Sequence, residues 1–265
     1  MATPFASPEP ANHTRWCFPD SEDGILAALE AGTTHLWANT ILFETHPLQS
    51  SERVQRYQDQ VNVVGQPPCL VQLYDDKDYV NNLLRRTGGY TMPKAWTITE
   101  ESSLDLKTLP YPVVAKPVRG RGSFGVKVCH SQAGLRDHLK DLFADSPTVM
   151  LEEYLAGEEA TITVMPPSNE NTDYWSLPIV TRFNHADGIA PYNGVVAVTS
   201  NSRVISQQEY DHDPAYSAAA RECEAVARLL RLTAPIRVDI RRREDKVGSL
   251  FVLFDVNMKP VSAIG

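Results

Sequence analysis

Three glycines between two short apolar segments constrain the fold of this chain more than any other feature. Gly120, Gly122 and Gly125 have the G-x-G-x-x-G spacing and follow Val113–Ala115, which reads as a buried strand. In a dinucleotide-binding fold the third glycine opens a helix, whereas here Val126–Val128 alternates like a second strand. The sequence therefore favours a strand–loop–strand hairpin over a Rossmann unit.

A hairpin with glycines at its tip is suited to cover phosphate groups, because its bare backbone N–H groups can donate to phosphate oxygens. Lys116 ends the first predicted strand, beneath the loop, where its ammonium is a natural point charge for a phosphate. Arg119 and Arg121 add positive charge nearby. A solvated hairpin with an ordinary surface lysine explains this segment alone equally well, so that alternative stays open.

An unusual concentration of negative charge follows further along the chain. Residues 151–159 place four carboxylates, those of Glu152, Glu153, Glu158 and Glu159, around a short connection between two apolar strands. A solvated turn is the simplest interpretation of the segment alone. Together with the glycine loop, the segment resembles a hinge between two lobes, in which the backbone from Glu153 through Tyr154 to Leu155 meets adenine and a carboxylate accepts from ribose hydroxyls.

The last part of the chain predicts a β-hairpin. Residues 236–241 alternate strictly, which places Arg237, Asp239 and Arg241 on one face and three β-branched residues on the other. On the partner strand, residues 250–257, the same alternation predicts a shared face for the side chains at positions 251, 253, 255 and 257. A turn centred near position 247 sets Asp239 opposite Asp255.

The same register sets Arg237 opposite Asn257, so two carboxylates and an amide oxygen are predicted to converge. Two facing aspartates repel each other, and a hard cation relieves the repulsion, since Mg²⁺ in proteins is usually held by one or two carboxylates together with substrate phosphates. The alternative is that Arg237 or Arg241 simply pairs with these acids.

The remaining pattern predicts an α+β organisation in three units, which cover residues 1–86, 87–154 and 155–265. Helices are expected over residues 22–31, 76–86, 131–143 and 213–230. Further strands are expected over residues 35–43, within 61–73, over 149–154 and 160–165, and near 177–183 and 195–199.

Composition excludes several classes of protein. A net charge of -8 argues against a protein whose main partner is a nucleic acid. No stretch is long and apolar enough to span a bilayer, and the N-terminal residues lack the pattern of a secretory signal. The four cysteines are scattered singly. We therefore expect a cytoplasmic protein with reduced thiols.

The order of these motifs resembles the ATP-grasp family, and within it the D-alanine–D-alanine ligases. The motifs are a lysine that opens a helix (Lys77), a second lysine before a glycine hairpin, an acidic hinge, and an Arg-x-Asp strand paired with an Asp-x-Asn strand. The resemblance covers residues 77–260. It implies that a nucleotide is held between two α+β lobes, with a small α/β lobe at the N-terminus.

The resemblance also implies roles for individual residues. Lys77 and Lys116 would bind the α- and β-phosphates, and Glu152 and Glu159 would accept from the adenine amino group and the ribose. The loop residues Gly120, Gly122, Ser123, Phe124 and Gly125 would cover the nucleotide. Asp239, Asp255 and Asn257 would carry two Mg²⁺ ions, for which Mn²⁺ can substitute, and Arg237 would stabilise the developing negative charge during the reaction, with Lys116 assisting.

The implied chemistry is phosphorylation of a carboxylate by ATP, followed by displacement of phosphate by an amine. The expected partners are a small acid and an amine, without nucleic acid or membrane, and the resemblance leaves room for a homodimer. The chain departs from the family at Asp255, where the family generally has Glu, and near residues 191–194, where no lysine matches the family's mobile segment. Arg182 and Arg203 are the candidates to replace that lysine.

Two alternatives to a ligase remain. One is a catalytically weak ATP-binding protein with a regulatory or assembly role, which would bind nucleotide without substrate-dependent phosphate release. The other is a protein kinase, which shares a glycine loop and a lysine. The sequence lacks the H-R-D and D-F-G motifs that a kinase requires.

Overall fold

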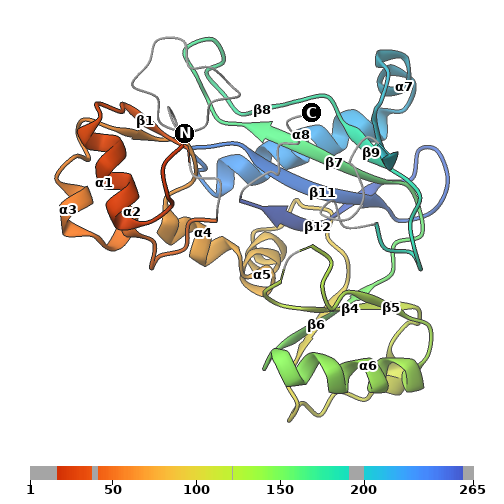
Figure 1. Ribbon diagram of the computed structural model, residues 1–265. Coiled ribbons are helices and arrows are strands. Elements are labelled where there is room, and N and C mark those ends of the chain that lie inside the picture. The colour runs from red at the N-terminus through yellow and green to blue at the C-terminus, as the bar shows by residue number, and fades with distance from the viewer. Residues whose placement is uncertain (1–16, 38–40, 121, 191–199, 259–265) are drawn as a thin grey trace.

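Two antiparallel β-sheets form the centre of the fold, and a smaller helical unit lies to one side (Figure 1). The computed structural model describes residues 17–37, 41–120, 122–190 and 200–258. The larger sheet has the strand order β10-β9-β7-β11-β12, with β8 paired to β7, and the smaller sheet has the order β3-β6-β4-β5. Within the described ranges, no helix combines the length and the apolar character needed to cross a membrane.

The N-terminal unit is built on one short helix. Ser21 caps this helix by accepting a hydrogen bond from the backbone N–H of Gly24. The apolar face of the helix packs against Leu36 and Val54. The elements of the unit are α1 (Glu22–Glu30), β1 (His35–Leu36), α2 (Pro47–Ser50), α3 (Glu52–Gln55), β2 (Asn62–Val63) and α4 (Pro68–Tyr74). β1 and β2 pair in parallel.

Both strand predictions in this unit were largely wrong. The strand expected over residues 35–43 ends at Leu36, residues 41–43 are not in a strand, and residues 38–40 lie outside the described part. The strand expected within residues 61–73 is only the two-residue β2, and residues 68–73 belong to the helix α4. Pro68 fits the first turn of α4, because its fixed φ suits a helix start and its missing N–H is not needed there.

Helix α5 (Lys77–Thr87) links the N-terminal unit to the sheets and confirms the prediction for residues 76–86. The side chain of Asp76 caps its start by accepting from the backbone of Tyr79, and Gly88 ends it with a φ of +75°. Val80 and Leu84 are buried in the core of the larger sheet. The helix therefore holds Lys77 at a fixed place next to β12.

The smaller sheet confirms the strand–loop–strand prediction. It comprises β3 (Ala95–Ile98), β4 (Val113–Pro117), β5 (Lys127–Cys129) and β6 (Val149–Glu153), and α6 (Gln132–Asp145) covers one of its faces. A short 3₁₀ helix spans Leu106–Thr108. Ser131 caps α6 as expected, and Leu135, Leu139 and Leu142 of that helix are buried against the sheet.

The larger sheet rests on helix α8, whose apolar face it buries. Its strands are β7 (Glu159–Met165), β8 (Trp175–Ser176), β9 (Val180–Arg182), β10 (Ser202–Val204), β11 (Ile236–Arg242) and β12 (Phe251–Asn257), and the helices are α7 (Gln207–His212) and α8 (Pro214–Leu229). Asp213 caps α8 by accepting from the backbone of Ala215. The strand expected over residues 195–199 lies outside the described residues.

The β11–β12 register confirms the predicted pairing of Asp239 with Asp255 and of Arg237 with Asn257. A β-bulge at Phe254 then shifts the register, because Ile240 pairs with Leu253. The prediction that positions 251, 253, 255 and 257 share one face was therefore wrong. Phe251 and Leu253 lie in the core with Val256, and Asp255 and Asn257 point to the other side.

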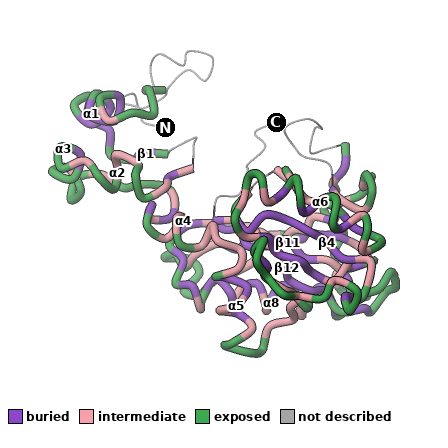
Figure 2. The backbone as a smooth tube through the Cα atoms, turned by 90° about the horizontal axis from the view of Figure 1, so that it is seen from below, coloured by how far each residue is buried: buried purple, intermediate pink, exposed green. Residues whose placement is uncertain are grey.

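The described residues form three hydrophobic clusters, and the largest of them includes Val71, Val80 and Leu84 together with residues of the larger sheet. Figure 2 shows the strands β4, β11 and β12 as buried. We propose unit boundaries at residues 1–86, 87–154 and 155–265, with helices α4 and α5 of the first unit packing against the third. The connection between β6 and β7 is fixed to β11: Gly157 N–H donates to the carbonyl of Arg242 at 3.1 Å, and Arg242 N–H donates to that of Glu158 at 2.9 Å.

Candidate active site

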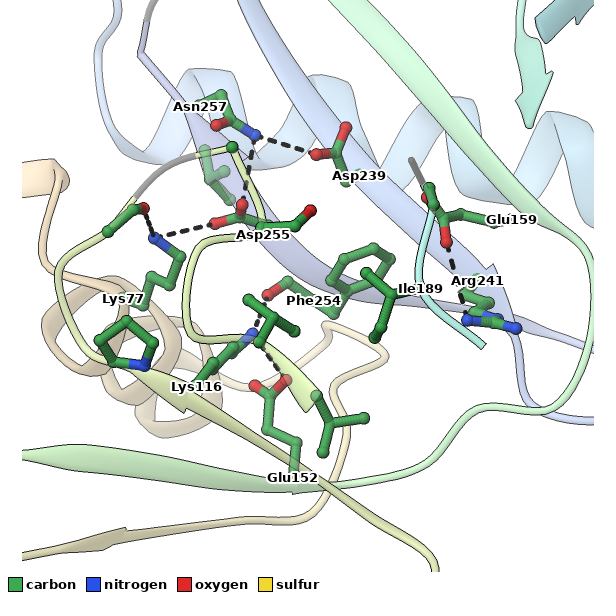
Figure 3. Close-up of a pocket in the computed structure, with 18 of the residues that line it drawn as sticks. Lys77, Lys116, Glu152, Glu159, Ile189, Asp239, Arg241, Phe254, Asp255 and Asn257 are labelled. Atoms are coloured by element: carbon green, nitrogen blue, oxygen red, sulfur yellow. Dashed lines mark hydrogen bonds and ion pairs between the residues drawn. The ribbon is translucent and has the colours of Figure 1, made fainter. Parts of the chain in front are cut away.

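A cavity of about 530 Å³ lies between the two sheets and brings the predicted site residues together. Figure 3 shows their charged groups pointing into a common space from α5, β4, β6, β7, β11 and β12. The predicted residues that line it are Lys77, Lys116, Gly120, Gly122, Ser123, Phe124, Glu152, Glu153, Tyr154, Leu155, Glu159, Arg237, Asp239, Asp255 and Asn257. Gly125 does not line it: a Cβ there would lie 2.9 Å from Leu142 Cδ2, so this glycine serves the turn against α6.

The two lysines approach β12 from different elements. Lys116, at the end of β4, is only 4% exposed, forms an ion pair with Glu152 at 2.7 Å and donates to the carbonyl of Phe254 at 3.1 Å. Lys77, in the first turn of α5, donates to the carbonyl of Gly120 at 2.8 Å and lies 3.9 Å from Asp255 (Figure 3). Two fixed ammonium groups in one cavity suit an anionic ligand with more than one charged oxygen.

The glycine loop curls back on itself between β4 and β5. Gly122, Ser123 and Gly125 have φ values of 63°, 60° and 72°, a region that favours glycine and is uncommon for serine. Phe124 stands at the tip and is 72% exposed. Arg121 lies outside the described residues. Arg119 pairs with Asp76 at 3.1 Å, which turns its charge toward the start of α5.

The acidic connection between the sheets presents an unpaired backbone N–H group to the cavity. Backbone N–H groups of Glu153 and Tyr154 donate to the carbonyls of Lys94 and Pro112, whereas that of Leu155 meets no acceptor within the described residues. A buried N–H without a partner is costly, and a ligand in the cavity can satisfy it. The adjacent Glu152 is buried, with one oxygen at Lys116 and the other accepting from Asn81 Nδ2 at 3.2 Å.

Asp239 and Asp255 face each other across β11 and β12 but have different neighbours. Asp239 accepts two hydrogen bonds from Arg237, at 2.7 and 2.8 Å, so the alternative interpretation of an arginine–acid pair holds for this residue. Burial raises the pKa of Asp239 despite Arg237. Burial also acts to raise the pKa of Asp255, but Lys77, Lys116 and Arg237 outweigh it and hold that pKa below its ordinary value.

These acids and Asn257 fit Mg²⁺ by the chemistry of their donors. Asn257 Nδ2 donates to Asp239 at 3.1 Å and to Asp255 at 3.5 Å, so its amide already lies between the two carboxylates. Turning that amide would present its oxygen to a cation. Among the described residues there is no group of three or more His, Cys, Asp or Glu side chains placed to hold a metal. Two carboxylates and one amide are a sufficient set where phosphate oxygens complete the coordination.

The structure separates the two arginines proposed to replace the family's lysine. Arg182, at the end of β9, lines the cavity. Arg203 lies on the surface and pairs with Glu209 through both of its terminal nitrogens, at 2.6 and 3.0 Å. Only Arg182 is placed to act in the cavity, and residues 191–194 lie outside the described part.

Several residues that line the cavity escaped the sequence-based prediction. Arg241 was placed on the correct face by the alternation of β11, but was considered only as a partner for the acids. Phe254 reaches the cavity because of the bulge, which the sequence did not reveal. Ile189 and Ala190 enter from the turn after β9, for which the sequence gave no signal.

The comparisons with known proteins agree with this geometry. A family model described as "D-ala D-ala ligase C-terminus" matches residues 90–260, more than half of the chain. The chain belongs to this family. The D-alanine–D-alanine ligase of Aquifex aeolicus is 27% identical over 187 residues, which are 70% of this chain and 58% of that protein. D-alanine–D-alanine ligase A of Bacillus cereus is 33% identical over 129 residues, 47% of this chain and 40% of that protein. The chain thus spans about half the length of these curated relatives.

Solved structures of a D-alanine–D-alanine ligase and of a D-Ala:D-Ser ligase share the fold. The Bacillus anthracis enzyme complexed with ATP aligns with a TM-score of 0.63 at 19% identity, over 91% of this chain and 73% of that one. The VanG D-Ala:D-Ser ligase of Enterococcus faecalis aligns with a TM-score of 0.57 at 20% identity, over 76% of this chain and 57% of that one. The fold is therefore the ATP-grasp fold, as expected from the sequence.

Proposed function

We propose that this protein is an ATP-dependent ligase that joins the carboxylate of an amino acid, or of a similar small acid, to an amine. The observation that carries the proposal is the convergence of Lys77, Lys116, the Leu155 N–H and the Asp239–Asp255 pair on one cavity between the two sheets. Membership of the D-ala D-ala ligase C-terminus family supports it. The names of the relatives point to D-alanine, and to D-serine for the Enterococcus faecalis structure, as the class of substrate to test first.

ATP would lie with its base at the connection between the sheets and its phosphates at the lysines. The Leu155 N–H would donate to a ring nitrogen of adenine. Glu152, which pairs with Lys116 and accepts from Asn81, would also accept from the exocyclic amino group. Glu159 would accept from the ribose. The glycine loop would cover the phosphates, with Phe124 at its tip excluding water.

The reaction would proceed in two displacements. An oxygen of the acid attacks the γ-phosphorus of ATP, the bond to the β–γ bridging oxygen breaks, and ADP leaves with that oxygen. The amine then attacks the acyl carbon, phosphate departs, and the amine nitrogen loses a proton. The protein contributes mainly by positioning the reactants and neutralising charge, with Lys116 and Lys77 at the phosphates and Arg237 at the reacting oxygens.

Asp239, Asp255 and Asn257 would hold Mg²⁺, or Mn²⁺, which when bound neutralises charge on the β- and γ-phosphates. Arg237, which contacts Asp239 through two hydrogen bonds, lies beside these acids and would stabilise negative charge that develops on the reacting oxygens.

The proposal is tested by phosphate release from Mg·ATP across single and paired D- and L-amino acids, with mass spectrometry of the products. Release that depends on a particular acid, together with a dipeptide or amide product, supports the ligase and names its substrates. Lys140→Ala provides a matched control, because this lysine is 76% exposed on the outer face of α6 and, among the described residues, pairs only with Asp137. Its activity should equal that of the wild type, whereas Lys116→Ala should lose ATP binding.

A second candidate function is an ATP-binding protein that turns over poorly. Asp255 favours it, because this acid is one methylene shorter than the family's glutamate and Lys77 already lies 3.9 Å from it. Calorimetry distinguishes the two candidates: ATP binding without phosphate release for any amino acid pair would favour the second.

A further inference from the structure

We propose that Arg241 is a positioning residue that fixes the adenosine end of the ATP site by tying three chain segments together. The proposal rests on the function proposed above, since it concerns the same cavity. Arg241 extends from β11 on the same face as Asp239, but toward the opposite end of the cavity from the two lysines (Figure 3). The guanidinium is largely buried, with 12% of the side chain exposed.

The guanidinium uses all three of its nitrogens. Nε donates to the carbonyl of Gly157 at 3.0 Å, one terminal nitrogen donates to the carbonyl of Gly188 at 2.7 Å, and the other donates to the Tyr154 hydroxyl at 3.3 Å. It also stacks over the Tyr154 ring, 5.1 Å from the centroid. Its charge lies 3.7 Å from a carboxylate oxygen of Glu159.

Arg241 connects three stretches of the chain. These are its own strand β11, residues 154–159, which link the two sheets and begin β7, and the turn after β9 that contains Gly188. The planar guanidinium presents donors in fixed directions, so one side chain can set the relative positions of all three segments. A flexible ammonium group has no such geometry.

The turn at residues 184–190 is one of the segments that Arg241 contacts, through the carbonyl of Gly188. Asn184, Asp187 and Gly188 have φ values of 58°, 49° and 79°, and a bridge between Ala186 and Ile189 closes the turn. A Cβ at Gly188 would lie 3.0 Å from the Tyr154 hydroxyl, so the turn packs tightly on the connection between the sheets. The next residue, Ile189, lines the cavity beside Phe254 (Figure 3).

The same turn also contacts the start of β7 through His185. His185 Nε2 lies 2.9 Å from Glu159 Oε2, the oxygen that also faces Arg241, and no described residue forms a hydrogen bond or ion pair with the other oxygen of Glu159. Arg241 and His185 therefore leave Glu159 with one oxygen available to a ligand. By fixing this oxygen, the Leu155 N–H and Ile189 together, Arg241 acts on the base and ribose, whereas the phosphate end depends on Lys77 and Lys116.

The test compares Mg·ATP with Mg·tripolyphosphate, which carries three phosphates and no adenosine, by calorimetry on the full chain. We expect Arg241→Ala to weaken ATP binding by about tenfold or more, because several charge-assisted hydrogen bonds are lost, and to change tripolyphosphate binding by less than about twofold. In turnover, KM for ATP should rise while kcat stays within about twofold. Arg241→Lys should recover little of the ATP affinity, since an ammonium cannot reach three acceptors in these directions.

Two further variants keep the proposal falsifiable. Gly188→Ala crowds the Tyr154 hydroxyl from the other side of the contact and should show the same selective loss of ATP affinity. Arg228→Ala removes a surface arginine that is 52% exposed and pairs with Asp173, and it should leave both affinities unchanged.

If the wild type binds ATP and Arg241→Ala binds it equally well, the role of Arg241 is refuted and the proposed function stands. An equal loss of ATP and tripolyphosphate affinity would also refute it, because the effect would then be a general loss of structure. A wild type that binds no ATP would overturn both this inference and the proposed function.

Discussion

The buried pair between Lys116 and Glu152 gives a quantitative test of how the cavity is held together. Their side chains are 6% and 4% exposed, and the charges lie 2.7 Å apart. Lys116→Met leaves the Glu152 carboxylate with only the hydrogen bond from Asn81. Removing one partner of a buried ion pair costs about 3–5 kcal/mol, and because this pair borders a cavity that admits water we expect the lower end of that range, about 3 kcal/mol.

For a protein of this size, each kcal/mol lowers Tm by roughly 2–4 °C, so Lys116→Met should melt roughly 6–12 °C below the wild type. Glu152→Gln alone leaves the ammonium of Lys116 buried and should also destabilise the protein. The double variant Lys116→Met/Glu152→Gln removes both charges and should recover about 2 kcal/mol relative to the sum of the single variants.

Urea unfolding of the four proteins at constant ionic strength measures this coupling. The pair between Lys140 and Asp137, 3.0 Å apart with both side chains more than 70% exposed, serves as the control and should show a coupling below about 0.5 kcal/mol. If the effects of Lys116→Met and Glu152→Gln simply add within about 0.5 kcal/mol, the pair does not hold the cavity as described.

Three further predictions concern the acids and the loop. Asp255→Ala should lower Mg²⁺-dependent turnover by about a hundredfold or more while the Kd for ATP changes less than about fivefold; wild-type turnover in this variant would exclude Asp255 as a metal ligand. Phe124→Gly should raise the ratio of futile ATP hydrolysis to product by roughly threefold or more, measured as phosphate released per product formed, and an unchanged ratio would remove the shielding role of Phe124. Burial acts to raise the pKa of Asp213, but two backbone N–H groups and Arg242 outweigh it and hold that pKa below 3.8, so its stabilising contribution is present above pH 3.8 and lost as the pH falls through the folded-state pKa. Below about pH 4, the free energy of unfolding of Asp213→Asn should therefore fall less steeply with falling pH than that of the wild type. If the two proteins lose stability equally with falling pH, the role of Asp213 is contradicted.

The parts of the fold that follow local rules could be predicted from the sequence. Alternation along residues 236–241 gave the pairing of Asp239 with Asp255 because the inward and outward faces of that strand differ in polarity. Asp76 and Gly88 marked the ends of α5, since a side-chain cap and a residue with positive φ are each required there.

Other parts depend on tertiary contacts that the sequence does not display. The bulge at Phe254 lies in the apolar run 251–254, where no residue type marks a register shift. Helix α4 looked like a strand, because a short apolar run is ambiguous between a strand and a buried helix turn. Helix α7 was missed although Ser206 and Glu209 form a capping box, a signal that the sequence does contain.

In the candidate site too, some residues could be placed from the sequence and others only from the folded structure. Alternation along the terminal hairpin predicted that Asp239 faces Asp255, whereas only the resemblance to the ATP-grasp family placed Lys77 and Lys116 at the same site. The role of Arg241 depends on acceptors from the turn at residues 184–190 and from the connection between the sheets, whose approach is set only by the folded chain.

The most direct test of the central proposal measures whether an oxygen atom of the acid's carboxylate is transferred to the released phosphate. An amino acid whose carboxylate is enriched in oxygen-18 is turned over with Mg·ATP, and the released phosphate is analysed by mass spectrometry. Activation through an acyl phosphate predicts that the phosphate carries one oxygen-18 atom, because the oxygen that attacks the γ-phosphorus leaves with phosphate when the amine attacks the acyl carbon. Phosphate released without the label would show that water, not the acid, receives the phosphoryl group, and would contradict the proposal that this chain is a carboxylate–amine ligase.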